Sequence, residues 1–144
     1  NIPAMIEAHF AVPMAGAVLN TLNKRLDAKT LAFMLKHAET KVLLVDPEFA
    51  AVATEALALV PQDIYVIDVD DAEYEYGFST PIGQIEYEDW LTDGDENFEW
   101  HLPQDEWDAI SLSYTSGTTG NPKGVVYHHR GAYINAARIS LLAV

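Results

Sequence analysis

The sequence predicts an α/β fold in which a mostly parallel sheet is flanked by helices. Two short apolar runs, residues 41–45 and 64–68, have the length and composition of buried strands. Segments with apolar residues at helical spacing precede and follow the first run. Short links between alternating helices and strands favour parallel neighbours, because parallel strands are joined through helical crossovers.

The first helix is expected at residues 3–17, where apolar side chains recur at helical spacing. Pro3 suits the first turn, because its missing N–H is one that a helix leaves unbonded. Pro13 should end or kink this helix. Val18 and Leu19 would then enter a short strand.

Two further helices are expected on either side of the strand at residues 41–45. Asp27 is the expected N-cap of a helix over residues 28–38, which carries an apolar stripe. Pro47 is expected to start a helix over residues 48–60, which is rich in Ala and Leu. The second apolar run follows that helix.

Residues 69–107 show no regular pattern, repeat or domain boundary, and acidic and aromatic residues alternate with glycine and proline. A short helix is expected at residues 85–91, and the acidic side chains around it are interpreted as a solvated surface. The tryptophans are interpreted as packing residues; they are Trp90, Trp100 and Trp107.

Two strands and a helix are expected in the last third of the chain, at residues 109–114, 124–127 and 130–144. The first of these strands is expected to be buried, together with the two apolar runs. A loop at residues 115–124 would join the two strands at an exposed rim.

That loop has the composition of a phosphate cradle. Glycines let a ligand approach the backbone, hydroxyls donate hydrogen bonds, and a lysine adds a mobile positive charge. The candidate binding residues are Thr115, Ser116, Gly117, Thr118, Thr119, Gly120, Lys123 and Gly124. A Walker A loop is excluded, because Pro122 precedes the lysine and glycine follows it. Composition alone also permits a flexible hairpin connection.

The string Tyr114-Thr-Ser-Gly-Thr-Thr-Gly-Asn-Pro-Lys-Gly124 closely resembles the phosphate-binding motif of the adenylate-forming (AMP-binding) superfamily. A second stretch, Ala8-His-Phe-Ala-Val-Pro-Met-Ala-Gly-Ala17, followed by Asn20 and Arg25-Leu-Asp27, resembles the family's upstream helix, strand and loop. Residues 125–133 are most similar to fatty-acyl and related acyl-CoA synthetases. The resemblance is weakest over residues 69–107.

The resemblance implies ATP-dependent activation of a carboxylic acid, most like a fatty acid, to an acyl-adenylate and then an acyl-CoA. ATP, Mg²⁺ and CoA are the implied cofactors and co-substrates. Thr115 resembles a magnesium-associated threonine, and residues 116–120 with Lys123 would hold the β- and γ-phosphates. An alternative is an adenylating enzyme with a carrier-protein or other acceptor. A second alternative is a non-catalytic nucleotide-binding module.

The resemblance also implies that residues 1–144 are part of a large N-terminal adenylation domain, because both ends look cut. An acidic metal ligand, a ribose-binding aspartate and a catalytic lysine would lie beyond residue 144. No catalytic residue is therefore assigned here, and Lys123 is not that catalytic lysine. The isolated piece is expected to be inactive.

Composition limits the partners. The chain has 8 Lys and Arg against 22 Asp and Glu, a formal charge of −14, which disfavours nucleic acid and anionic membranes. No apolar run reaches the ~20 residues of a membrane span. With no cysteine and no secretory signal, a cytoplasmic location is expected. A homodimer is left open as an oligomeric state.

Other residue patterns favour structural roles. His128 and His129 follow a strand, and the favoured interpretation is that they cap the helix after it rather than bind a ligand. Neighbouring side chains in a strand point to opposite faces, so the pair cannot readily share one ligand. Asp68, Asp70 and Asp71 lack the spacing of a calcium loop. Ser111 and Ser113 lack a hydrolase elbow.

Overall fold

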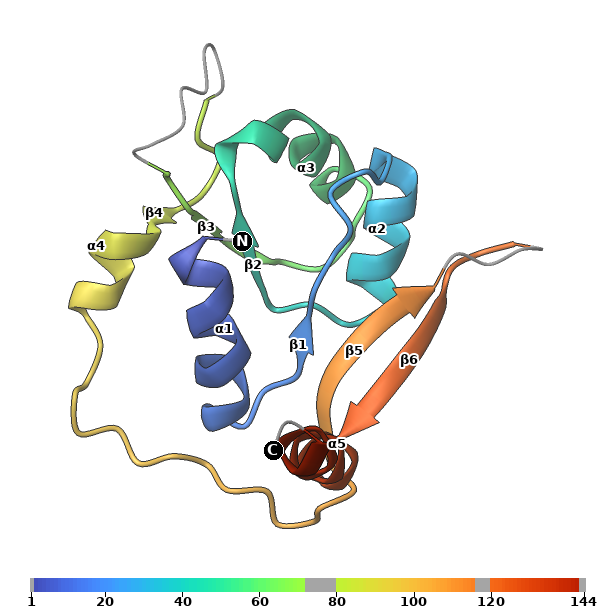
Figure 1. Cartoon of the computed structure of the whole chain (residues 1–144). Helices are drawn as coiled ribbons and strands as arrows, with labels where there is room; N and C mark the ends of the chain where they lie inside the picture. Colours follow the sequence, from blue (N-terminus) through green and yellow to red (C-terminus); the bar gives the residue numbers. More distant parts are fainter. Residues whose placement is uncertain (1, 72–79, 116–119, 143–144) are drawn as a thin grey trace. The chain divides into compact units, whose positions relative to one another are not determined.

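The computed structural model describes residues 2–71, 80–115 and 120–142 (Figure 1). The chain forms two compact units: a terminal unit (residues 1–22 and 98–144) and a central unit (residues 23–97). The elements in chain order are α1 (Pro3–Met14), β1 (Leu19–Asn20), α2 (Ala28–His37), β2 (Val42–Val45), η1 (Pro47–Phe49), α3 (Ala50–Leu57), β3 (Tyr65–Asp68), β4 (Ile85–Glu86), α4 (Tyr87–Thr92), β5 (Ala109–Thr115), β6 (Lys123–His128) and α5 (His129–Leu142).

The central unit is a parallel three-stranded sheet, in the order β2-β3-β4, with α2 and α3 packed against each other. Its core combines apolar residues of both helices and both longer strands, and Leu35 and Ile67 are completely buried. The two apolar runs therefore form the buried strands that the sequence predicts.

The helices of the central unit begin as expected. Asp27 caps α2, because its Oδ1 accepts a hydrogen bond from the Thr30 backbone N–H at 2.9 Å. Pro47 also starts a helical segment, but its first turn is the 3₁₀ helix η1. α3 ends at Leu57 rather than at residue 60. Beyond it, the N–H groups of Leu59 and Val60 each donate a hydrogen bond to the carbonyl three residues earlier, which forms a turn.

The short strand β4 occupies the first two residues of the helix expected at residues 85–91, and the helix α4 starts only at Tyr87. β4 extends the sheet partly through the side chain of Gln84, whose Oε1 accepts a hydrogen bond from the Val66 N–H at 2.6 Å. The Gln84 N–H donates to the Val66 carbonyl at 2.9 Å. A two-residue strand completed by a side chain leaves too short a pattern to detect.

Asp68 has a structural role in the central unit. Its carboxylate is buried and accepts hydrogen bonds from the N–H groups of Ile82, at 3.1 Å, and Gly83, at 2.6 Å. A Cβ on Gly83 would lie 2.7 Å from the Asp68 backbone nitrogen, which is closer than packing allows. The carboxylate thus satisfies two backbone donors, as a buried charged group requires.

The terminal unit contains a mixed sheet in the order β1-β5-β6. β1 pairs with β5 in parallel, and β5 pairs with β6 as an antiparallel hairpin. Among the described residues, three of the four strand pairings are parallel, in agreement with a mostly parallel sheet. β5 is half-buried along most of its length, which differs from the buried strand that was expected.

The helix α1 ends one residue after Pro13, as the sequence predicts. Gly16, with a φ of +71°, closes it: its N–H bonds the Pro13 carbonyl at 2.9 Å, and the Ala17 N–H bonds the Val12 carbonyl at 3.0 Å. The His101 N–H donates a hydrogen bond to the Met14 carbonyl at 2.8 Å. These bonds satisfy carbonyls that a helix end leaves free.

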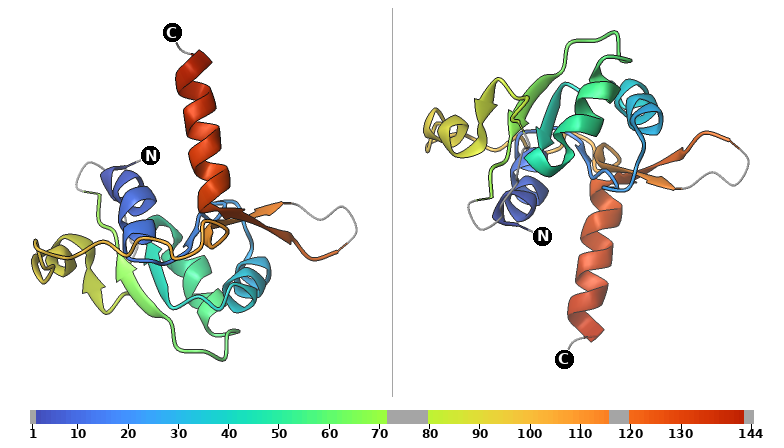
Figure 2. Two further views of the ribbon diagram at one scale, coloured as in Figure 1. Left: turned by 90° about the horizontal axis from the view of Figure 1, so that it is seen from below. Right: turned by 90° about the horizontal axis from the view of Figure 1, so that it is seen from above.

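Figure 2 shows α5 leaving the base of the β5–β6 hairpin at a steep angle. None of its described residues is buried, although the helix carries apolar side chains such as Leu141. No described helix has the length and apolar run needed to cross a membrane.

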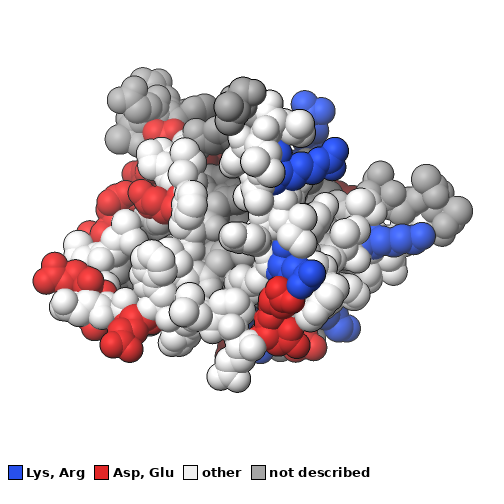
Figure 3. Space-filling view, turned by 60° about the horizontal axis from the view of Figure 1, so that its bottom comes forward, with Lys and Arg blue, Asp and Glu red and all other residues white. Residues whose placement is uncertain are grey.

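Charge is unevenly distributed along the chain. No Lys or Arg occurs between Lys41 and Lys123. On the face drawn in Figure 3, most acidic side chains are accordingly not interleaved with Lys or Arg.

Candidate nucleotide site

The candidate site is built on the open end of the β5–β6 hairpin, where the described ends of the loop are exposed. Thr115 is the last residue of β5 and Lys123 the first residue of β6, and the two are direct cross-strand partners. Direct partners have Cβ atoms about 4.5–5.5 Å apart and share a face of the sheet. Both residues are exposed. The fold therefore brings a hydroxyl and an ammonium group together at the loop.

Two of the candidate glycines lie beside this pair. Gly124 is the cross-strand partner of Tyr114. Gly120 has a φ of +156°, and a Cβ built on it would meet none of the described residues within 4 Å. The described residues therefore leave space next to Gly120. Four further candidates, Ser116, Gly117, Thr118 and Thr119, lie outside the described residues.

The charge of Lys123 is uncompensated within the described part of the chain. The only ion pair found there joins Arg130 to Glu106. No carboxylate in that part approaches the Lys123 ammonium to ion-pair distance. The net charge of the chain, −14, repels a phosphate group, but the Lys123 ammonium beside a hydroxyl can attract one locally.

Tyr114, the residue before Thr115 in β5, is less accessible to solvent than Thr115 or Lys123. Tyr114 is half-buried, and this burial raises the pKa of its phenol above the ordinary value. The phenol is therefore neutral at physiological pH and adds no negative charge next to Lys123.

The expected magnesium contact, Thr115, offers a single hydroxyl oxygen. Among residues 2–71, 80–115 and 120–142, no group of three or more His, Asp or Glu side chains is arranged to hold a metal ion. These residues do not form a protein cage for Mg²⁺. They fit an ion held mainly by nucleotide phosphates, which is how Mg²⁺ commonly binds in proteins.

His128 caps α5, which confirms the favoured interpretation of this residue. Its Nδ1 accepts a hydrogen bond from the Gly131 backbone N–H at 2.8 Å, and the helix starts at the next residue, His129. Nδ1 must be unprotonated to accept this bond.

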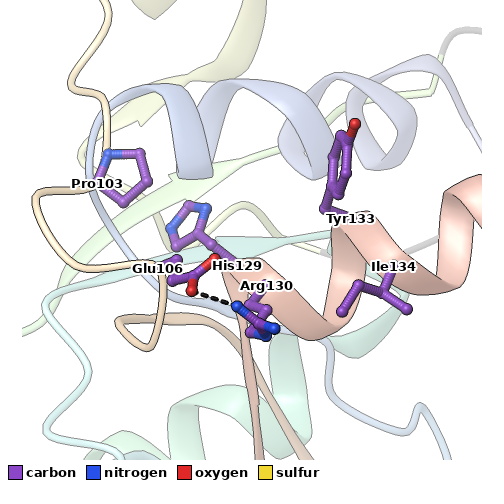
Figure 4. A pocket seen from close by; sticks show the side chains of 6 residues that line it. All are labelled: Pro103, Glu106, His129, Arg130, Tyr133 and Ile134. Atoms are coloured by element: carbon purple, nitrogen blue, oxygen red, sulfur yellow. Dashed lines mark hydrogen bonds and ion pairs between the residues drawn. The ribbon is translucent and has the colours of Figure 1, made fainter.

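A groove lies at the other end of β6, beside the start of α5 (Figure 4). Its lining residues are Pro103, Glu106, His129, Arg130, Tyr133 and Ile134. Figure 4 shows the ion pair between Glu106 and Arg130 at its edge. Lys123 and this groove occupy opposite ends of β6, so the fold does not bring the groove together with the loop residues.

The α/β fold, and the hairpin that brings Thr115 next to Lys123, agree with the class of protein that the loop motif resembles. Sequence comparison specifies the class further. Residues 1–143 match the AMP-binding enzyme family, and the chain belongs to that family.

Several of the curated relatives are named as CoA ligases of plants. Acetate/butyrate–CoA ligase AAE7 of Arabidopsis thaliana is 51% identical over 146 residues, which cover 94% of this chain and 26% of that protein. Acetate–CoA ligase CCL3 of Humulus lupulus is 48% identical over 154 residues, covering 99% of this chain and 27% of that protein. The chain thus spans about a quarter of the length of these relatives.

Solved structures share the fold. The anthranilate CoA ligase AuaEII in complex with anthranoyl-AMP superposes with a TM-score of 0.80 at 22% identity, over 93% of this chain and 24% of that one. The acetoacetyl-CoA synthetase of Streptomyces lividans gives a TM-score of 0.74 at 22% identity, over 94% of this chain and 21% of that one. The mixed α/β architecture predicted from sequence is that of these enzymes.

Proposed function

We propose that the complete protein activates a carboxylic acid with ATP, forming an acyl-adenylate and then an acyl-CoA. The observation that carries this proposal is the Thr115–Lys123 pair, which places a hydroxyl and an unpaired cation at the phosphate motif of an AMP-binding family member. The plant relatives that are named as acid–CoA ligases support the same reaction.

The reaction has two steps. A carboxylate oxygen attacks the α-phosphorus of ATP, the bond from that phosphorus to the bridging oxygen breaks, and pyrophosphate leaves. The CoA thiol, losing its proton, then attacks the acyl carbon, and AMP leaves. Negative charge gathers on the departing phosphates in the first step, so fixed donors near them lower the barrier.

Lys123 is proposed to neutralise charge on the β- and γ-phosphates, with Thr115 donating its hydroxyl beside it. The space that the described residues leave next to Gly120 gives a phosphate room to approach the backbone. Residues 116–119 and Gly124 are proposed to complete the cradle. Mg²⁺ bound with ATP would supply further charge neutralisation, and Thr115 is the residue proposed to contact it.

The acid is proposed to be a fatty acid of short chain. Sequence similarity to fatty-acyl CoA ligases suggests the class, and relatives named for acetate, butyrate and 2-methylpropanoate suggest small members of it. The cytoplasmic location stays a prediction, because several relatives carry the word peroxisomal in their names. A homodimer likewise remains a proposal.

Residues 1–144 are proposed to be part of the N-terminal adenylation domain. The remaining nucleotide and CoA contacts would then come from sequence beyond this chain, which spans about a quarter of the length of these relatives. Incubated alone with ATP, Mg²⁺, CoA and fatty acids, the 144-residue chain should release no AMP above a boiled control.

The test of the function uses the complete protein and acids from acetate to palmitate. Acid-dependent exchange of pyrophosphate into ATP is expected, followed by AMP and acyl-CoA when CoA is added. Formation of ADP instead of AMP would contradict adenylation. Exchange without transfer to CoA would support the alternative of a carrier-protein or other acceptor, and nucleotide binding without exchange would support a non-catalytic module.

A further inference from the structure

The first N–H groups of α5 are all satisfied by protein acceptors. The His129 N–H donates to the Asp108 carbonyl at 3.1 Å, and the Arg130 N–H donates to the Glu106 carbonyl at 2.8 Å. The Gly131 N–H donates to His128 Nδ1. Because protein acceptors occupy these donors, the start of α5 binds residues 106–108 and is not an anion site.

Trp107 also contacts residues at the start of α5. Its ring is 4.6 Å from the His128 ring, centroid to centroid, and the Arg130 guanidinium carbon lies 5.7 Å from its centroid. The same guanidinium is paired with Glu106. The turn that carries Trp107 is closed by the Asp105 carboxylate, which accepts the Trp107 N–H at 2.9 Å. One indole thus contacts both the last residue of β6 and the first turn of α5.

The strand pairing is irregular at the end of the hairpin that leads into α5. Ala109 is the partner of His128, whereas Ser111 is the partner of Tyr127, so β5 has one extra residue there. Such an extra residue is a β-bulge. Beyond it the pairing is continuous up to Thr115 and Lys123. The bulge therefore sets which residue Lys123 opposes at the loop.

A register without the bulge would differ by one residue along the whole hairpin. Lys123 would then oppose Tyr114 instead of Thr115, and Val125 would oppose Leu112 instead of Ser113. A one-residue slip also moves each side chain to the opposite face relative to its partners. β6 is an edge strand paired only with β5 in its sheet. Apart from that pairing, its register among the described residues depends on the contacts between residues 106–108 and the start of α5.

We propose that Trp107 is a positioning residue that holds the bulged register of the β5–β6 hairpin and so keeps Lys123 opposite Thr115. The consequence for catalysis rests on the proposed function, whereas the register itself does not. The Glu106–Arg130 pair is exposed, and exposed ion pairs contribute little to stability. The Trp107 ring is also exposed, but it contacts both the His128 ring and the Arg130 guanidinium, so it joins the end of β6 to the start of α5.

Cysteine pairs report the register directly, because this chain has no cysteine of its own. The native pair is Ser113→Cys with Val125→Cys, which are cross-strand partners. The slipped pair is Leu112→Cys with Val125→Cys, which become partners only without the bulge. A disulfide needs Cα atoms about 4.4–6.8 Å apart and Cβ atoms that face each other, so each pair closes only in its own register.

The experiment places each cysteine pair in the complete protein with Trp107, Trp107→Ala, Trp107→Phe or Trp100→Ala. Trp100 is the matched control, because it is as exposed as Trp107, at 63% against 62%, and none of the ring contacts found among the described residues involves it. Disulfides are identified by mass spectrometry of linked peptides. Circular dichroism checks that each variant is folded, and Trp107→Leu replaces Trp107→Ala if the latter is not.

Trp107→Ala should lower the yield of the native disulfide and produce the slipped one, whereas Trp107→Phe and Trp100→Ala should keep the native pattern. An unchanged native yield with no slipped disulfide in Trp107→Ala or Trp107→Leu would overturn the proposal. Pyrophosphate exchange is measured in the cysteine-free background, where misplacement of Lys123 should reduce the rate by about 10–100-fold. A slipped register without loss of exchange would leave the register role intact and contradict the role given to Lys123.

Discussion

Thr115 and Lys123 face each other as the last cross-strand pair before the loop, although seven residues separate them in sequence. The backbone pairing of β5 with β6 holds these two side chains together, so their proximity does not depend on the conformation of the loop. The pair thus has a fixed position at the base of the loop that is proposed to bind the nucleotide phosphates.

The side chain of Lys123 is predicted to act on the first half-reaction. Lys123→Ala removes a charged donor to the leaving pyrophosphate, and loss of such a donor costs about 2.7–4 kcal/mol, or 10²–10³ in rate. Thioester formation from a pre-made acyl-adenylate should be much less affected, because pyrophosphate has already left. Both half-reactions are measured in the complete protein by pyrophosphate exchange and by AMP release.

Lys36→Ala is the control for that variant, because Lys36 is also an exposed lysine but lies on α2. It should change neither half-reaction. Equal losses in both half-reactions of Lys123→Ala would mean that the lysine organises the whole site, and its assignment to pyrophosphate would fail.

The helix cap formed by His128 is predicted to contribute to stability. His128→Ala removes the acceptor for the Gly131 N–H and should lower the free energy of unfolding by about 1 kcal/mol, as loss of a cap does. His128→Asn offers another short acceptor and should recover most of that loss. Urea denaturation followed by circular dichroism measures both, and equal stabilities of the Ala and Asn variants would exclude a capping role.

The contact between Gly83 and Asp68 is predicted to exclude any side chain at position 83. In Gly83→Ala the new Cβ would lie 2.7 Å from the Asp68 nitrogen, so buried backbone must move. Overpacking of this kind costs about 1–3 kcal/mol. Gly94→Ala is the comparison, because its Cβ would meet one carbonyl oxygen at 3.1 Å on the exposed end of α4. Similar thermal midpoints for the two variants would contradict this reading of Gly83.

The raised pKa of Tyr114 predicts a loss of stability at high pH. Its phenol ionises less readily when folded, so the stabilisation is fully present below the ordinary tyrosine pKa of about 10. It is lost as the pH rises from that value through the folded pKa, because the unfolded chain ionises first. Tyr114→Phe should flatten this decline, which denaturation at a series of pH values measures. An unchanged pH profile in the variant would remove Tyr114 as the cause.

Residues with local signals could be predicted from the sequence. Asp27, Pro47 and Pro13 act on the backbone next to them, and each is found at the helix boundary expected of it. The loop residues Thr115 and Lys123 were found by their motif, and the hairpin explains how they meet.

Features that depend on distant partners could not be predicted. Trp107 was interpreted as a packing residue, but its contact with Arg130 requires the hairpin to return the chain to its start. Gln84 joins the sheet through its side chain, which no periodicity reveals. The half-burial of β5 also depends on neighbours that its own alternating pattern does not specify.

The division of the chain has a consequence for the order in which it folds. The central unit is one continuous segment, residues 23–97, so all its contacts can form before residue 98 leaves the ribosome. β1 must wait, because its partner Ser111 is synthesised only after that whole segment. Closing so long a loop costs less entropy once the intervening chain is compact. Pulse-labelling hydrogen exchange during refolding should therefore find amide protection in β2 and β3 before any in β1.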